Sequence, residues 1–228
     1  MTACEICDGV GLVPTERGSK PCSCQSRQEQ QIRLGKVGIP AEFAGATLAG
    51  FRPCPHTQKA LALARYYLAE YIPGQTKTGL IFTGSTGTGK THLAAGLARE
   101  LAEQKGVETR FVDMNNLLDR LRIADFDKAP SETREGILAP IHAAELVVLD
   151  DLGAMRSNDW VFDTLQGLIG RFYNSQKPTI ITTNLLNEPF NAQARIPTLG
   201  ERIGERMFSR LQQMCRAIDM TGPDWRRK

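Results

Sequence analysis

The chain has 228 residues, of which 41% are hydrophobic, so it is long enough for one α/β domain with a sizeable core and a small appendage. A formal net charge of +3 excludes a dedicated basic coat for nucleic acid, and any contact with DNA is expected to be local. No apolar segment follows Met1 and no run approaches the length of a membrane span, so we expect a cytoplasmic protein without a membrane partner.

The first 24 residues hold four of the six cysteines in two close pairs: Cys4, Cys7, Cys22 and Cys24. Thiolates paired in this way can surround Zn²⁺ tetrahedrally, which is the closed geometry of a structural zinc site. Free thiols or a redox pair are the alternative interpretation. A zinc knuckle of this size has too little core to fold alone, so we expect it to be a docking surface for a partner.

Two helices are predicted before the centre of the chain. Residues 25–38 are polar and favour a short connecting helix that is ended by Gly35 and Gly38. Residues 57–72 carry apolar side chains at helical spacing, which predicts a helix that packs on the core.

A glycine-rich loop stands between a predicted strand at 79–82 and a predicted helix at 91–101. The loop matches G-x-x-x-x-G-K-[ST] with Gly84, Ser85, Thr86, Gly87, Thr88, Gly89, Lys90 and Thr91. Its backbone N–H groups can face a phosphate chain at the positive end of the helix. Lys90 is expected to reach the β- and γ-phosphates, and the Thr91 hydroxyl to bind Mg²⁺. The flanking strand and helix favour this interpretation over a glycine-rich turn without a ligand.

Two carboxylates follow an apolar strand later in the chain. A strand at 109–112 and helices at 115–126 and 137–144 are predicted first, and the apolar run 145–149 then ends at Asp150 and Asp151. Open α/β sheets bind ligands at the carboxyl ends of their strands. Asp150 is expected to hold Mg²⁺ and Asp151 to polarise an attacking water. A surface turn is the alternative for this pair.

The next predicted helix, at 160–173, leads into a strand at 178–183 that ends in the polar side chain of Asn184. An amide both donates and accepts hydrogen bonds, so Asn184 could span the γ-phosphate and the attacking water. Capping the turn after the strand is its alternative role.

A single last helix is predicted over 201–215, followed by a final strand at 216–220. One face of this helix repeats Arg202, Arg206 and Arg210 every fourth residue. The stripe is either an edge that faces phosphate or a solvated face paired with Glu201 and Glu205.

Together these segments resemble the AAA+ ATPases of the DnaC/DnaI type, the bacterial replicative helicase loaders, with the IstB transposition ATPases as close relatives. The resemblance runs from about Ile39 to Arg226. It rests on the glycine-rich loop continued through His92 and Leu93, on Leu146–Gly153, Thr182–Asn184, Phe208–Leu211 and Trp225-Arg226. The ending Asp-Asp-Leu-Gly is typical of this group, and the cysteine module resembles the zinc-binding adaptor of some loaders.

The resemblance implies an α/β P-loop AAA+ domain at 39–228, with a parallel five-stranded sheet flanked by helices. A zinc-knuckle adaptor and its connecting helix are expected to precede it at 1–38. Only eight residues follow Met220, so a C-terminal lid domain is not expected.

The resemblance also assigns roles to single residues. Asn184 becomes the sensor-1 residue, Arg210 an arginine finger that enters a neighbouring subunit's site, and Arg226 a contact to the nucleotide. His92 joins the nucleotide-binding loop. Because Asp151 stands where most AAA+ proteins have the longer Glu, hydrolysis is expected to be slow, with ATP acting mainly as an assembly switch.

The implied function is an ATP-dependent loader that binds ATP, Mg²⁺ and Zn²⁺, self-associates through its ATP site and places a DnaB-type helicase hexamer on single-stranded DNA. The loop at 154–160 is the candidate DNA contact. An IstB-like transposition ATPase is the nearest rival, but it normally lacks a cysteine knuckle. A P-loop phosphotransferase acting on a small molecule and a zinc adaptor with a nucleotide switch are further alternatives.

Overall fold

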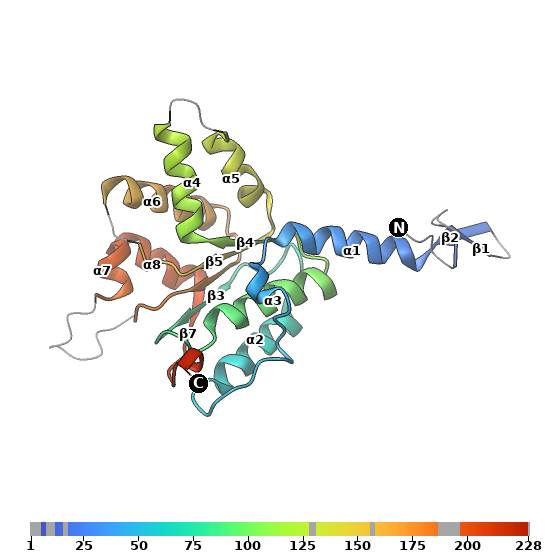
Figure 1. Cartoon of the computed structure of the whole chain (residues 1–228), viewed down its shortest axis with the longest axis horizontal. Coiled ribbons are helices and arrows are strands. Elements are labelled where there is room, and N and C mark those ends of the chain that lie inside the picture. Colours follow the sequence, from blue (N-terminus) through green and yellow to red (C-terminus); the bar gives the residue numbers. More distant parts are fainter. Residues whose placement is uncertain are drawn as a thin grey trace.

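Five runs rich in β-branched and other apolar residues form the central sheet of the computed structural model, which describes residues 6–7, 12–15, 18–127, 131–155, 158–186 and 197–227. The strands are β3 (Gly79–Thr83), β4 (Thr109–Asp113), β5 (Leu146–Asp150), β6 (Thr179–Thr182) and β7 (Cys215–Asp219). They lie in the order β4-β5-β6-β3-β7, and every neighbouring pair is parallel (Figure 1). The predicted parallel five-stranded sheet is confirmed.

Alternate residues of each strand face opposite sides of the sheet, so the sheet separates two hydrophobic cores. On β3, Leu80 and Phe82 belong to one core and Ile81 to the other. On β5, Val148 joins the first core and Leu149 the second. Strands that are buried on both faces read as continuous apolar runs, which is why their positions were predictable.

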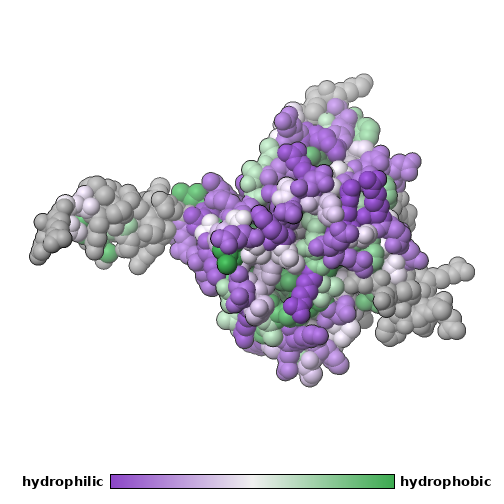
Figure 2. Space-filling model, turned by 180° about the vertical axis from the view of Figure 1, so that it is seen from behind, coloured by the Kyte–Doolittle hydropathy of each residue, from purple (hydrophilic) through white to green (hydrophobic). Residues whose placement is uncertain are grey.

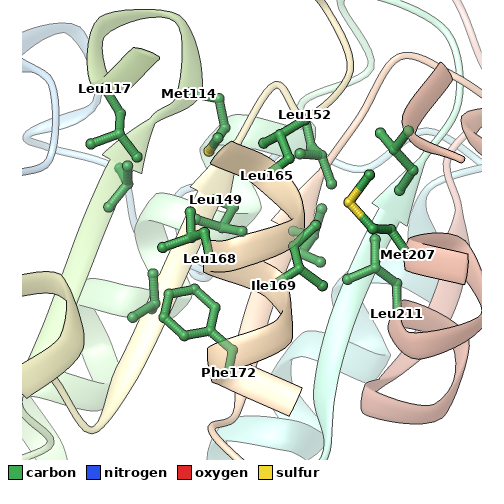
Figure 3. Packing of buried hydrophobic residues seen from close by; sticks show 14 of the residues in the cluster. Met114, Leu117, Leu149, Leu152, Leu165, Leu168, Ile169, Phe172, Met207 and Leu211 are labelled. Carbon is green, nitrogen blue, oxygen red and sulfur yellow. The ribbon is translucent and has the colours of Figure 1, made fainter. Parts of the chain in front are cut away.

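Helices cover both faces of the sheet. The core that contains Phe82 is closed by α2 (Gln58–Glu70) and α3 (Lys90–Gln104), with the short η1 (Ala41–Phe43) beside them. The core that contains Leu149 is closed by α4 (Met114–Phe126), α5 (Arg134–Ala143), α6 (Asp159–Asn174), α7 (Leu199–Ile203) and α8 (Glu205–Met214). Figure 3 shows Leu168, Ile169 and Phe172 of α6 packed within this second core, with Met207 and Leu211 of α8 close by.

The prediction of one last helix over 201–215 is wrong. Thr198 and Glu201 form a capping box that starts α7, and Gly204 then interrupts the helix with φ 90° before α8 begins. The first strand residue is Cys215, so α8 ends one residue earlier than predicted. The arginine stripe is therefore divided: Arg202 lies on α7, while Arg206 and Arg210 lie on α8.

The N-terminal part contains a hairpin that the cysteine pattern did not predict. Strands β1 (Leu12–Thr15) and β2 (Gly18–Pro21) pair antiparallel and lead into α1 (Ser23–Val37). Figure 1 shows α1 running out from the sheet with this hairpin at its far end. The helix continues through Gly35, so an end at that residue was wrongly predicted, but the predicted end at Gly38 is confirmed, because Gly38 caps the helix with φ 78°.

The second half of α1 packs on the α/β domain. Gln30 donates to the carbonyl of Glu103 at 3.3 Å, and Arg33 to that of Ala102 at 3.5 Å. Val37 is fully buried in the first core. The division at residue 38 stays a prediction, but the end of α1 is anchored to α3.

Hydrophilic residues cover most of the face seen in Figure 2, with hydrophobic ones in small patches between them. Within the described ranges, no helix combines the length and the apolar character that a membrane span needs.

Candidate nucleotide site

The glycine-rich loop has the conformation that its sequence requires. Gly84, Gly87 and Gly89 take φ angles of 125°, 78° and 92°, which side chains with a Cβ rarely adopt. The loop leads directly into α3, whose first residue is Lys90. The Lys90 ammonium donates to the carbonyls of Gly84 at 2.9 Å and Ser85 at 2.7 Å, so the loop holds its cation at the entrance of the helix.

Lys90 is buried, and its surroundings change its acidity. Burial lowers the pKa of the ammonium to about 8. The carboxylate of Asp151 raises this pKa, the Arg226 guanidinium lowers it, and Asp150 raises it again. A buried lysine that is not fully balanced by carboxylates is a good partner for an added anion such as a phosphate chain.

Asp150 ends β5 and is held by two hydroxyl groups. Thr182 of the neighbouring β6 donates to Asp150 Oδ1 at 2.6 Å, and the hydroxyl of Thr91 is also hydrogen-bonded to this carboxylate. Burial raises the pKa of Asp150, and the two hydroxyl groups counter part of that rise. A hydroxyl and a carboxylate side by side are the kind of oxygen ligands that Mg²⁺ takes from a protein beside substrate phosphates. Thr91 and Asp150 therefore fit the cation predicted for them.

Asp151 has an uncommon backbone conformation, with φ 59°. Its N–H donates to the Thr182 hydroxyl at 2.9 Å, and its carboxylate accepts from Asn184 Nδ2 at 2.8 Å. Burial raises the pKa of Asp151, while the charge of Lys90 lowers it. Left-handed backbone at a residue with a Cβ is concentrated at functional sites, and here it places the carboxylate beside Asn184.

These groups line one cavity of about 390 Å³. The lining residues are Glu42, Phe43, Thr86, Gly87, Gly89, Lys90, Thr91, His92, Asp150, Asp151, Thr182, Asn184, Trp225 and Arg226. The structure thus brings Lys90, Asp150, Asp151, Asn184 and Arg226 together, although their individual roles stay predictions.

Some lining residues had no signal in the sequence. Glu42 and Phe43 come from the segment before α2, which arrives at the cavity through η1. Phe51 of the same segment packs against the loop, because a Cβ at Gly89 would lie 2.6 Å from its ring. His92 lies 3.2 Å from the carbonyl of Thr47 through Nε2, so it joins this segment to α3 as well as lining the cavity.

The C-terminal segment lies on the glycine-rich loop. The Trp225 N–H donates to the carbonyl of Gly87 at 3.2 Å, within the short η2 (Trp225–Arg227). Asp224 Oδ1 accepts from the Arg226 N–H at 3.0 Å. A Cβ at Gly87 would lie 1.8 Å from that carboxylate, so the loop and the segment fit only with glycine there.

Arg210 does not line the cavity of its own chain. Its guanidinium lies 5.4 Å from the ring centroid of Tyr173, beside a shallow hollow along α6. Among the described residues, Arg206 and Arg210 form no ion pair with a glutamate, and Glu201 accepts from the Thr198 N–H at 2.7 Å.

The zinc prediction falls partly outside the described residues, which exclude Cys4 and the side chain of Cys24. Cys7 and Cys22 are both buried. Because Leu12 pairs with Pro21, the chain enters and leaves the hairpin at the same end, and Cys22 directly follows that end. Within the described part of the chain no group of three or more metal-ligating side chains occurs, and the four-thiolate site stays a prediction.

The candidate DNA loop is only partly described, since 156–157 lie outside the described residues. Trp160 stands at the start of α6 and donates through Nε1 to Asp125 at 3.0 Å. Its ring lies 6.0 Å from that of Phe126, which is 69% exposed at the end of α4.

Comparison with known proteins agrees with this architecture. A family model described as IstB-like ATP binding protein matches residues 27–228. The replicative helicase loader DnaC of Escherichia coli (strain K12) is 27% identical over 197 residues, which cover 84% of this chain and 76% of that protein. The uncharacterized protein YqaM of Bacillus subtilis (strain 168) is 26% identical over 210 residues, 87% of this chain but only 61% of its own length.

Among solved structures, the crystal structure of the DnaC helicase loader is similar, with a TM-score of 0.67 and 30% identity. The similarity covers 79% of this chain and 99% of that one. The family match contains every residue that lines the cavity, from Glu42 to Arg226. The chain therefore belongs to the family of IstB-like ATP-binding proteins, and the DnaC helicase loaders are among its relatives.

Proposed function

We propose that this protein is an ATP-dependent loader that docks on a DnaB-type replicative helicase hexamer and helps to place it on single-stranded DNA. The observation that carries the proposal is the cavity that gathers Lys90, Asp150, Asp151 and Asn184 in a chain similar to a helicase loader. ATP binding and slow hydrolysis in this cavity control the assembly.

In this proposal ATP binds with its phosphates on the loop Gly84–Thr91, and Mg²⁺ is held by Thr91 and Asp150. Asp151 polarises the attacking water, and Asn184 orients it, which the 2.8 Å bond between their side chains supports. Asp150→Asn is expected to lower Mg²⁺-dependent hydrolysis while the protein stays folded, because the amide keeps the shape and removes the charge. Turnover equal to that of the wild type would contradict the assignment.

Single-stranded DNA is proposed to bind along the loop at 154–160 and the neighbouring aromatic pair. Phe126 and Trp160 offer ring faces on which bases can stack without regard to sequence. Phe126→Leu is expected to weaken binding of a fluorescent oligothymidine about tenfold. Tyr66→Leu is the matched control, since Tyr66 is 61% exposed on α2.

The ATP site is proposed to be completed by a second copy of the chain. Arg210 lies outside its own cavity, and a guanidinium can clamp a phosphate bidentately. Its charge would then stabilise the transition state of the neighbour's ATP, which is how the chain self-associates through its ATP site.

The cysteine module is proposed to bind one structural Zn²⁺ through Cys4, Cys7, Cys22 and Cys24 and to dock on the partner. The test is metal analysis of the purified full chain, with about one zinc per chain expected. Cys7→Ser combined with Cys22→Ser should lose the zinc and the docking but keep ATP binding. Cys54→Ser, outside the module, should change neither. Zinc-free wild-type protein prepared without chelators would contradict this part.

Loading is tested on circular single-stranded DNA that is coated with single-strand-binding protein and carries an annealed oligonucleotide. The replicative helicase of the same organism should release the oligonucleotide only when the chain and ATP are present, and Lys90→Ala should not support release. A chain that binds the helicase but leaves release unchanged would overturn the loader proposal.

The family model that matches the chain favours a second candidate, a transposition ATPase of the IstB kind. This candidate predicts that the chain binds a transposase and stimulates strand transfer. Pull-down with residues 1–38 and with the full chain separates the two, because a helicase is expected for a loader and a transposase for the rival.

A further inference from the structure

The guanidinium of Arg210 is held in place by a second helix. Arg210 and Gln213 are three residues apart on α8, so their side chains leave the helix on the same face. Both contact Tyr173 near the end of α6: the guanidinium lies 5.4 Å from the ring centroid, and the Tyr173 hydroxyl donates to Gln213 Oε1 at 2.8 Å. The hydroxyl contact links Tyr173 to α8, and the face of its ring receives the cation.

The same cation lies over a glycine. Gly170 precedes Tyr173 by one helical turn, and a Cβ at Gly170 would lie 3.0 Å from Arg210 Nη1. Gly167, one turn earlier on α6, has open space where its Cβ would be. Only one of these two helical glycines therefore makes room for the guanidinium.

An aromatic ring holds a cation without neutralising it. The ion pairs of the described residues do not include Arg210, so its position comes from the ring and the glycine rather than from a carboxylate. A carboxylate at this place would compete for the cation and repel a phosphate, whereas a cation–π contact leaves the full charge for an incoming anion.

We propose that Tyr173 and Gly170 are positioning residues for Arg210, which they hold in place and charged for the γ-phosphate in a second copy of the chain. This inference rests on the proposed action of Arg210 in trans. The packing of α6 on α8 through Ile169, Met207 and Leu211 gives the pair a rigid base (Figure 3). Rigid neighbours order the guanidinium in advance, which lowers the entropy that is lost when its charge stabilises the transition state.

The test measures kcat and the KM for ATP of the full-length protein at saturating single-stranded DNA. Tyr173→Leu is expected to lower kcat about threefold to tenfold with an unchanged KM, since it removes the ring face. Tyr173→Phe keeps that face and should stay within about twofold of the wild type. Gly170→Ala should lower kcat several-fold because its methyl group displaces the guanidinium, while Gly167→Ala serves as the matched control and should not. Alanine has a higher helix propensity than glycine, so neither substitution should unfold α6, and a loss of kcat would not come from unfolding.

A double-mutant cycle separates positioning from a general effect on the fold. With Arg210→Ala already present, Tyr173→Leu should cause no further loss of turnover, measured with radiolabelled ATP. An equal loss in both backgrounds, or Gly170→Ala no different from Gly167→Ala, would overturn the inference and leave the role of Arg210 standing. Wild-type kcat in Arg210→Ala itself would overturn the proposed action in trans and this inference with it.

Discussion

The cavity around Lys90 and the surface around Arg210 hold their charged groups in different ways. Three charged groups of the cavity have polar neighbours from their own chain: two carbonyls for Lys90, two hydroxyls for Asp150 and an amide for Asp151. At the surface, Arg210 rests on an aromatic ring. Burial shifts the pKa values of all three cavity groups.

The cavity around Lys90 is therefore assembled within one folded chain, whereas the surface around Arg210 leaves its guanidinium available to another molecule. The cavity groups come from the ends of neighbouring parallel strands and the helix that follows the loop, so folding alone brings them together. Arg210 comes from α8, which packs over the second core, and folding leaves it outside the cavity.

The largest effect is expected from Lys90→Ala. The change removes the cation that faces the phosphates, so ATP affinity should fall by about a hundredfold or more and turnover should be lost. Isothermal titration with ATP measures the affinity. Arg65→Ala, on α2, is a control for the loss of a positive charge elsewhere. Retained affinity in Lys90→Ala would mean that the cavity is not the nucleotide site.

Arg210→Ala is expected to act on turnover alone. An arginine that stabilises the transition state contributes at least about a hundredfold to hydrolysis, while the ground-state affinity for ATP should stay unchanged. Steady-state hydrolysis and ATP titration on the same preparation give the two quantities. A parallel loss of affinity would place Arg210 in ground-state binding instead.

Mixing the two variants sharpens the contrast further. The Lys90→Ala subunit keeps Arg210, and the Arg210→Ala subunit keeps an intact nucleotide loop. In a mixed assembly, one type of interface therefore joins an intact loop to an intact Arg210. Part of the ATPase activity should return on mixing, and co-assembly is checked by cross-linking. Co-assembly without any return of activity would mean that Arg210 acts within its own subunit.

The lowered pKa of Lys90 predicts a pH dependence of binding. The ammonium favours the phosphates only while it is protonated, and its pKa is about 8. ATP affinity should therefore be highest below pH 8 and fall by roughly tenfold between pH 7 and pH 9, as the proton is lost. Lys90→Arg stays charged over this range and should give a flat profile. A wild-type profile as flat as that of the arginine variant would contradict the assignment to Lys90.

The sheet and most of the cavity were predictable because their signals are local. Buried parallel strands read as apolar runs, and the polar residues that directly follow them, such as Asp150 and Asn184, must lie at one edge. The break at Gly204 was not predictable from helical spacing, since the apolar positions continue through it. The capping box of Thr198 and Glu201 is a local sequence pattern that marks the start of α7, but the continuous helical spacing of apolar residues gave no reason to look for it.

The remaining parts of the site depend on contacts between distant segments. Phe43 and Phe51 arrive through a linker without periodicity, and their place at the loop is set by packing on α3. The contact of Tyr173 with Arg210 depends on how α6 and α8 cross, which no pattern within either helix records. Such contacts become visible only in the folded structure.

The smallest effect is expected at the C-terminal segment, which joins the cavity from the far end of the chain. Asp224 accepts from the Arg226 N–H and so holds η2 against Gly87. Asp224→Ala removes that acceptor and should weaken ATP binding about threefold, in line with the loss of a capping interaction.

Asp224→Asn also removes the negative charge but keeps an acceptor oxygen, so a comparison of the two variants isolates the hydrogen bond from the charge. Titration with ATP should place the asparagine variant at or above the affinity of the wild type, because the charge that repels phosphate is gone. Equal weakening in both variants would show that the carboxylate charge, and not its capping of the segment, matters for the cavity.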